Sequence, residues 1–182
     1  MGGIEVIEEI KDGNLYLRKI SKEDTNFFFQ SLKNRDMTNY LSLGPLISFE
    51  HSRRLIKNYL KSWTNYVQFN YVIELRDNKK ISRIGSVSLW NINWLHQRSG
   101  TGIWILPTFW ERGIGTKTIS LIKIIGFNHL KLNRIEAHIA VKNDRSIKTF
   151  KKCGFIEEGT LKEYLNISGE FQDALVVACL KP

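Results

Sequence analysis

Residues 109–117 read FWERGIGTK, with two glycines one residue apart between Arg112 and Lys117. Gly costs about 1 kcal/mol relative to Ala inside a helix, so Gly-x-Gly at a helix start answers a need for unusual backbone angles or close approach of a ligand. The stretch follows a predicted strand, SGTGIWILP, and precedes an apolar run. In such a strand–turn–helix unit the free N–H groups of residues 112–117 point toward the end of the strand, as in a phosphate-binding turn.

Two common phosphate-binding motifs do not fit this turn. The dinucleotide fingerprint needs a third glycine at position 118, where the chain has Thr118, and the P-loop needs Gly-Lys-Ser/Thr after four intervening residues. On its own, the Gly-x-Gly pair is equally consistent with an ordinary tight turn. The assignment therefore depends on what else the chain carries.

The composition predicts one globular domain. Of the 182 residues, 42% are hydrophobic and 25% charged, a balance typical of a chain with a buried core. The formal net charge of +9 fits nucleic acid, an acidic cofactor or a lysine-rich proteome. Nucleic acid is the least favoured partner, because Lys and Arg are scattered and no recognition-helix, zinc-finger or RNA-stacking signature accompanies them. The positive field would still attract a polyphosphate.

The cysteines and apolar runs indicate the compartment. Cys153 and Cys179 show no metal-ligand spacing, and their apolar surroundings favour buried thiols over a disulfide. We therefore expect a cytoplasmic protein without a metal. The start, MGGIEVIEEIKDG, has no targeting pattern, and apolar runs such as 119–127 are short and interrupted by charge, so no membrane partner is expected.

Periodic patterns predict alternating strands and helices. A strand is expected at 14–21, and Ser21 with Asp24 forms a capping box for a helix through Leu32. A second helix fits 49–63, and strands at 69–75 and 81–92 form a hairpin around the turn 77–80. Two helices should carry apolar faces: Leu55, Tyr59 and Trp63 in the helix 49–63, and Ile114, Thr118, Leu121, Ile122 and Ile125 in the helix after Gly113.

The C-terminal part continues this alternation. A strand is expected at 134–141, a short helix in NDRSIKTFKKCGF that Gly154 ends, and two final strands around the turn 166–169. Residues 14–182 would form a single domain behind an N-terminal extension of residues 1–13. In the strand 134–141, the alternation points Ile135, Ala137, Ile139 and Val141 inward and Glu136 and His138 outward.

The pair ILPTFWERGIGTK and NDRSIKTFKKCGF resembles the GNAT superfamily of acetyl-CoA-dependent N-acetyltransferases, and the chain follows its element order from about residue 14 to 182. The INW segment, the Trp110 turn and the closing EYLNISGEFQDALV look like the Rim-type subgroup, the ribosomal-protein N-terminal acetyltransferases. The resemblance implies an α/β (α+β) fold with a central, mixed, mostly antiparallel twisted sheet of six to seven strands and about four flanking helices.

The resemblance also implies a binding site for acetyl-CoA. The strand Gly102–Leu106 would splay from its neighbour and leave backbone groups near Ile105 free for the pantetheine arm, while the turn holds the pyrophosphate. Asn143 matches the family asparagine that contacts the cofactor arm, although alone it reads as a helix cap. The implied cofactor-binding residues are Trp104, Ile105, Leu106, Arg112, Gly113, Ile114, Gly115, Thr116, Lys117, Asn143 and Lys152.

Amide formation needs a neutral amine, a donor for the oxyanion and a proton for the departing thiolate, with direct attack through a tetrahedral intermediate. Many family members place a tyrosine acid where this chain has Phe150. Ser146 is the first candidate proton donor and Tyr164 the second; alternatively, water serves or no dedicated acid exists. Glu163 is the first candidate base, with His96 and His138 as alternatives. Read without the family, each could be an ordinary surface or strand residue.

The favoured acceptor is a protein N-terminus. An α-amine with a pKa near 7.7–8.0 is about one-tenth neutral at pH 7, whereas a lysine-like amine near 10.4 is neutral only about once in 2,500. The alternatives are a polyamine or other small amine, or a CoA-binding module without turnover. A homodimer is compatible with the edge strands of this architecture. Further candidates for the acceptor side are the carboxylates Glu157, Glu158, Glu163, Glu170 and Asp173 and the aromatic residues Trp63, Trp90 and Trp94.

Overall fold

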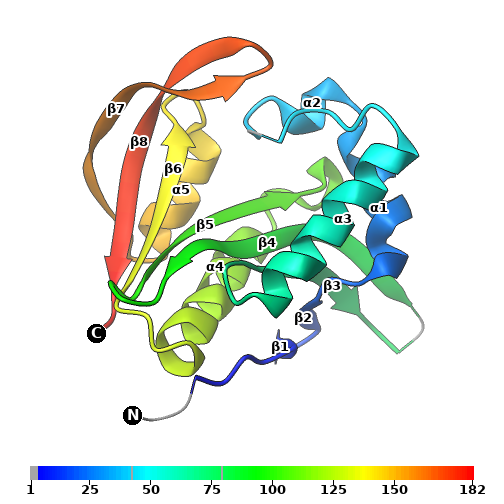
Figure 1. Cartoon of the computed structure of the whole chain (residues 1–182), viewed down its shortest axis with the longest axis horizontal. Coiled ribbons are helices and arrows are strands. Elements are labelled where there is room, and N and C mark those ends of the chain that lie inside the picture. Colours follow the sequence, from blue (N-terminus) through cyan, green and yellow to red (C-terminus); the bar gives the residue numbers. More distant parts are fainter. Residues whose placement is uncertain (1–3, 42, 79) are drawn as a thin grey trace.

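The computed structural model describes residues 4–41, 43–78 and 80–182, without the side chain of residue 36. Within this part, eight strands form one sheet in the order β1-β2-β3-β4-β5-β6-β8-β7 (Figure 1). The strands are β1 (Glu9–Asp12), β2 (Leu15–Lys19), β3 (Phe69–Arg76), β4 (Ile81–Asn93), β5 (Arg98–Ile105), β6 (Arg134–Ala140), β7 (Ile156–Ile167) and β8 (Glu170–Leu180). The α-helices are α1 (Thr25–Leu32), α2 (Arg35–Thr38), α3 (Phe49–Thr64), α4 (Ile114–Ile124) and α5 (Asp144–Lys152).

The sheet is mixed and mostly antiparallel, as predicted. In the described part of the chain only β5 and β6 pair in parallel, and every other pair is antiparallel. The predicted number of six to seven strands was wrong by one, because Glu9–Asp12 in the expected extension pairs with β2. This four-residue strand is mostly exposed, so it carries no apolar alternation that a sequence could reveal.

Local signals define the helix ends. The Ser21 N–H donates to the Asp24 carboxylate at 2.8 Å, which confirms the capping box before α1. Ser48 caps α3 by accepting from the His51 N–H at 3.0 Å. Gly154 follows α5 with φ +82°, a left-handed angle that favours glycine and ends the helix. The β3–β4 hairpin is also confirmed, although Lys79 of its turn lies outside the described residues.

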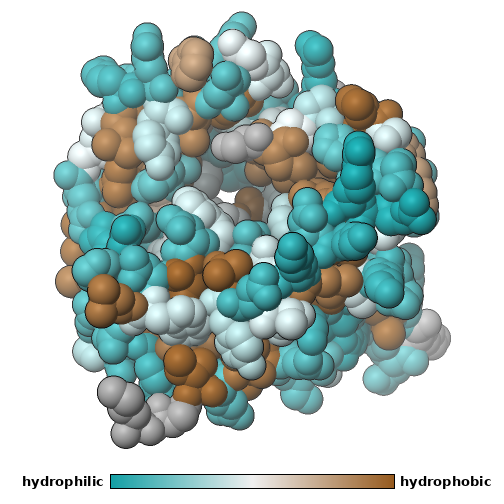
Figure 2. All heavy atoms as spheres, viewed as in Figure 1, coloured by the Kyte–Doolittle hydropathy of each residue, from teal (hydrophilic) through white to brown (hydrophobic). Residues whose placement is uncertain are grey.

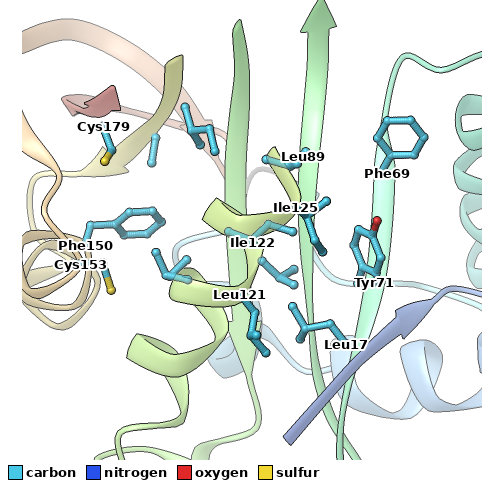
Figure 3. Close-up of a cluster of buried hydrophobic side chains, with 14 of the residues drawn as sticks. Leu17, Phe69, Tyr71, Leu89, Leu121, Ile122, Ile125, Phe150, Cys153 and Cys179 are labelled. Atoms are coloured by element: carbon cyan, nitrogen blue, oxygen red, sulfur yellow. The ribbon is translucent and has the colours of Figure 1, made fainter. Parts of the chain in front are cut away.

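Helices cover both faces of the sheet. One core cluster lies between the sheet and the helices α4 and α5. Figure 3 shows Leu121 and Ile122 of α4, with Ile125 just after it, between the strands and α5. The other cluster packs α1 and α3 against the opposite face through Ile20, Phe28, Leu32, Leu46, Ile56 and Val72. Cys153 and Cys179 are buried free thiols, as predicted, and burial raises the pKa of Cys153. No described helix combines the length and apolarity needed to cross a bilayer.

One inward prediction was wrong. Val141 is 39% exposed because β6 ends at Ala140 and Val141 begins the turn toward α5. Ile135, Ala137 and Ile139 are buried, so the alternation within the strand itself is confirmed.

Candidate active site

Strands β5 and β6 form a fork. They pair only from Arg98 with Arg134 to Gly100 with Glu136, and beyond these residues each strand pairs solely with its other neighbour. Figure 1 shows the two strands leaving a common point near the C-terminus and diverging. The predicted splay therefore exists, and the facing backbone edges of the two strands are separated beyond Gly100.

A cavity of about 630 Å³ lies at this fork, and Figure 2 shows the corresponding face hollowed near its middle. Its wall combines the parted strands with α1, α3, β4, α5 and β7. The residues that matter below are Trp90 on β4, His138 on β6, Asn143 and Ser146 at the start of α5, Phe150 on α5 and Tyr164 on β7.

The floor of the cavity is polar but lacks charge. Asn70, Ser86 and Thr101 lie buried on β3, β4 and β5. Ser86 donates to the Tyr71 carbonyl at 2.8 Å and Thr101 to the Ser88 carbonyl at 2.9 Å. Among the described lining residues none is Asp, Glu, Lys or Arg. Burial raises the pKa of Tyr59, which also lines the cavity, to about 12, so this phenol stays neutral.

The turn before α4 has the geometry of an anion site. Gly113 is the N-cap of α4 with φ +73°, and no acidic side chain stands in the first turn. The first N–H groups of a helix have no intrahelical acceptor, and they carry the positive end of the helix dipole. The described side chains leave this end open: Arg112 is exposed against the Phe109 ring, and Lys117 pairs only loosely with Asp12 at 3.7 Å.

The loop between β5 and α4 is braced from two sides. Trp110 donates from Nε1 to the Ile105 carbonyl at 2.7 Å, and the Arg145 guanidinium of α5 lies 3.2 Å from the Trp110 ring centroid. The prediction that backbone groups near Ile105 are free is therefore wrong for this carbonyl, because Trp110 folds back onto its own strand. The sequence analysis did not predict the contact of Arg145 with Trp110. The available signal was that Arg145 lies two residues after Asn143, in the second motif.

The start of α5 lies against the same cavity. Asn143 is the N-cap of α5 and accepts from the Ser146 N–H at 3.2 Å, which confirms the capping interpretation. Asn143 and Ser146 both line the cavity, as does the buried Phe150. Gly115 lets α5 approach the turn closely, because it has no Cβ. A Cβ at this position would lie 3.3 Å from the Thr149 side chain.

Residues 14–156 match the acetyltransferase (GNAT) domain family. The chain is a GNAT acetyltransferase. It is 31% identical over 162 residues to the spermidine N(1)-acetyltransferase of Vibrio cholerae, covering 89% of this chain and 90% of that protein. It is 29% identical over 173 residues to the uncharacterized N-acetyltransferase YoaA of Bacillus subtilis, covering 95% and 97%. The crystal structure of a spermidine N-acetyltransferase from Vibrio cholerae in complex with CoA and spermine superposes with a TM-score of 0.82 at 29% identity, covering 93% and 97%.

As a member of this family, the GNAT acetyltransferase is an enzyme that uses acetyl-CoA as its acetyl donor and an amine as its acceptor. The residues present suit this donor. The acid-free first turn of α4 and the nearby Arg112 and Lys117 suit a diphosphate, and the fork offers strand edges to the rest of the molecule. When bound, acetyl-CoA supplies the thioester carbonyl that the amine attacks.

The structure brings only part of the predicted catalytic set together in the acetyltransferase. Ser146 and Tyr164 reach the cavity, and Tyr164 is half exposed. Glu163 does not line the cavity: it lies exposed at a bulge of β7 with φ +49°, and its N–H donates to Asp173. Lys152 is exposed in the last turn of α5.

None of the carboxylates suggested for the acceptor side is among the described residues that line the cavity. Three of these carboxylates instead bind basic side chains on the outer surface: Glu157 binds Lys151 at 2.6 Å, Glu158 binds Arg134 at 2.6 Å, and Asp173 binds Lys162 at 2.8 Å. Of the three tryptophans expected there, Trp90 lines the cavity, Trp63 is in the core, and Trp94 donates to the Tyr66 carbonyl.

His138 lines the cavity, although the sequence placed it on an outward face. The alternation placed it correctly on the face opposite Ala137, but that face is covered, and the His138 side chain is only 13% exposed. Asn70, Ser86 and Thr101, small polar residues in apolar strands, were the available signal that this face borders a cavity. His96, the other histidine considered, lies in the exposed β4–β5 loop.

Proposed function

We propose that this acetyltransferase transfers the acetyl group of acetyl-CoA to the α-amine of a protein N-terminus. The observation that carries the proposal is the absence of any carboxylate among the described residues that line the cavity. A buried polycation needs paired carboxylates to offset its desolvation, whereas a single amine that reacts in its neutral form does not. Rim-type features of the sequence, such as the INW segment and the Trp110 turn, support the same acceptor.

The cavity also fits an acceptor that enters as a chain end. It is lined by aromatic and small polar groups such as Trp90, Tyr59 and Ser88, which suit a peptide backbone and a neutral side chain. About one-tenth of an α-amine population is neutral at pH 7, so the reaction needs only a weak base to deprotonate the acceptor.

In this proposal Ser146 donates the proton that the departing thiolate needs. Its hydroxyl lies at the start of α5, one turn before the position where Phe150 lacks a phenol. Tyr164 is the second candidate donor, because it reaches the cavity from β7. Asn143, the turn Arg112–Lys117 and the β5 edge at Trp104–Leu106 hold the donor.

A polyamine is the second candidate acceptor. It is favoured by the 31% identity to the Vibrio cholerae spermidine enzyme and by the structural match to a spermidine enzyme crystallised with CoA and spermine. The charge-free lining of this cavity argues against it as the preferred acceptor.

A competition assay separates the candidates. The enzyme is incubated with labelled acetyl-CoA and either a panel of short peptides with free N-termini or spermidine. The same peptides with blocked N-termini and an internal lysine serve as matched controls. We expect kcat/KM to be higher for free N-termini than for spermidine, and no product from the blocked peptides. Higher kcat/KM on spermidine would make the polyamine the acceptor, and CoA binding without any product would leave a binding module.

A further inference from the structure

His138 lies just past the point where the fork opens. The last parallel pair joins Gly100 to Glu136, and His138 is two residues further along β6, on the same face as Glu136. Its side chain is 13% exposed and lines the cavity. Among the described residues that line the cavity it is the only histidine, and none of those lining residues is a carboxylate. No other described group in the cavity wall titrates near neutral pH in its ordinary form.

The imidazole is held on three sides. Its Nε2 lies 3.5 Å from Glu136 Oε1, and its ring meets the Tyr164 ring edge to face, at 4.9 Å between centroids. The Trp90 ring lies at 6.0 Å on the β4 side. Glu136 is fixed in turn, because Arg134 donates to its Oε2 at 2.9 Å and Arg98 lies 3.6 Å from its Oε1.

The carboxylate of Glu136 lies on the Nε2 side of the ring. With the proton on Nε2, the lone pair on Nδ1 is the one that can accept a proton. The other titratable side chains among the described residues that line the cavity are the phenols Tyr40, Tyr59 and Tyr164. Arg98 and Arg134 contact Glu136.

We propose that His138 is the general base of the acetyl transfer and that Glu136 is its positioning residue. The inference rests on the proposed function of this cavity. As the amine nitrogen forms its bond to the acetyl carbon, it becomes cationic, and His138 takes the proton that this nitrogen sheds. The bond from the acetyl carbon to sulfur then breaks, and the thiolate gains a proton from Ser146 or water. The imidazolium returns its proton to solvent, and Ser146, where it is the donor, regains one from solvent, so the products are the amide and CoA thiol.

The test compares His138→Gln with His96→Gln, a matched change of a histidine that is exposed in the β4–β5 loop and does not line the cavity. We expect His138→Gln to lower kcat/KM about 10²-fold, with CoA affinity unchanged by titration, and His96→Gln to leave both unchanged. The loss should shrink as pH rises, because the amine then reacts without help. Adding imidazole to His138→Ala should restore part of the rate, and adding it to His96→Ala should not change the rate.

The pH profile of the wild type needs no variant and so remains informative if a substitution prevents folding. It is recorded with acceptors of different amine pKa, because an ionisation of the amine moves with the acceptor and one of the enzyme does not. We expect an acid-side ionisation of kcat/KM that stays fixed. Glu136→Gln should lower kcat while amine KM and CoA affinity stay unchanged, because the imidazole then loses the carboxylate that orients it.

Activity measurements distinguish the proposed function of the enzyme from the proposed role of His138. A wild type that acetylates no amine at any pH refutes the proposed function. A wild type that acetylates amines but lacks the fixed acid-side ionisation, or that is matched in rate by a folded His138→Gln at every pH, refutes the role of His138 and leaves the proposed function intact.

Discussion

Replacing Asp24 with Ala removes the carboxylate on which the start of α1 depends. Its side chain is fully buried and accepts from Arg18 at 2.8 and 2.7 Å and from the Ser21 N–H at 2.8 Å. Arg83 lies 3.3 Å away. The helix that follows carries Phe28, whose ring packs against Trp104 at 5.3 Å on the wall of the cavity.

The expected cost follows from what remains after the change. Removing one partner of a buried ion pair costs about 3–5 kcal/mol, because it leaves the other charge without compensation. Arg18 is 19% exposed in its side chain and keeps Glu74 at 2.7 Å, so the lower end of that range applies. A loss of about 3 kcal/mol corresponds to a fall in Tm of roughly 6–12 °C for a chain of this size.

Thermal and urea unfolding of the variant, followed by circular dichroism, measure this cost. Asp173→Ala is the matched control, because Asp173 also binds a basic side chain and a backbone N–H but lies at the surface, and its Tm should stay unchanged. Amine KM should rise in Asp24→Ala more than CoA affinity falls. A free energy loss below about 1 kcal/mol, the size of a surface pair, would refute the buried-pair argument.

Three further outcomes are expected. Burial raises the pKa of Asp24, but hydrogen bonds from Arg18 and Ser21 lower it more. The stabilisation by Asp24 is therefore full above the unfolded pKa of about 3.9 and is lost as pH falls through the lower folded pKa. Once the pH is below about 4, the urea midpoint of the wild type should decrease, and that of Asp24→Ala should decrease less. Ser146→Ala should reduce kcat about 10²-fold with unchanged CoA affinity, and an unaltered kcat would remove Ser146 from the mechanism. Gly100→Ala places a Cβ 2.5 Å from the Trp90 ring, so unfolding free energy should fall by about 1–3 kcal/mol and amine KM should rise; full tolerance would mean that Trp90 moves freely.

Much of the fold could be predicted because its signals are local. The apolar faces of α4 and β6, the Asp24 capping box and the left-handed Gly154 each depend on residues a few positions apart. β1 could not be predicted, because Glu9–Asp12 is short and mostly exposed and carries no apolar alternation.

The candidate site also combines features set by the local sequence with features set by tertiary packing. The sequence by itself determined the glycine turn at Gly113 before α4 and the cap at Asn143, since helix ends and glycine angles are set by the local chain. The tertiary structure decided which side chains line the cavity. Glu163 lies outside it at a bulge, and His138 lies inside it against Tyr164, because which face of a strand meets a cavity depends on elements distant in the sequence that pack over it.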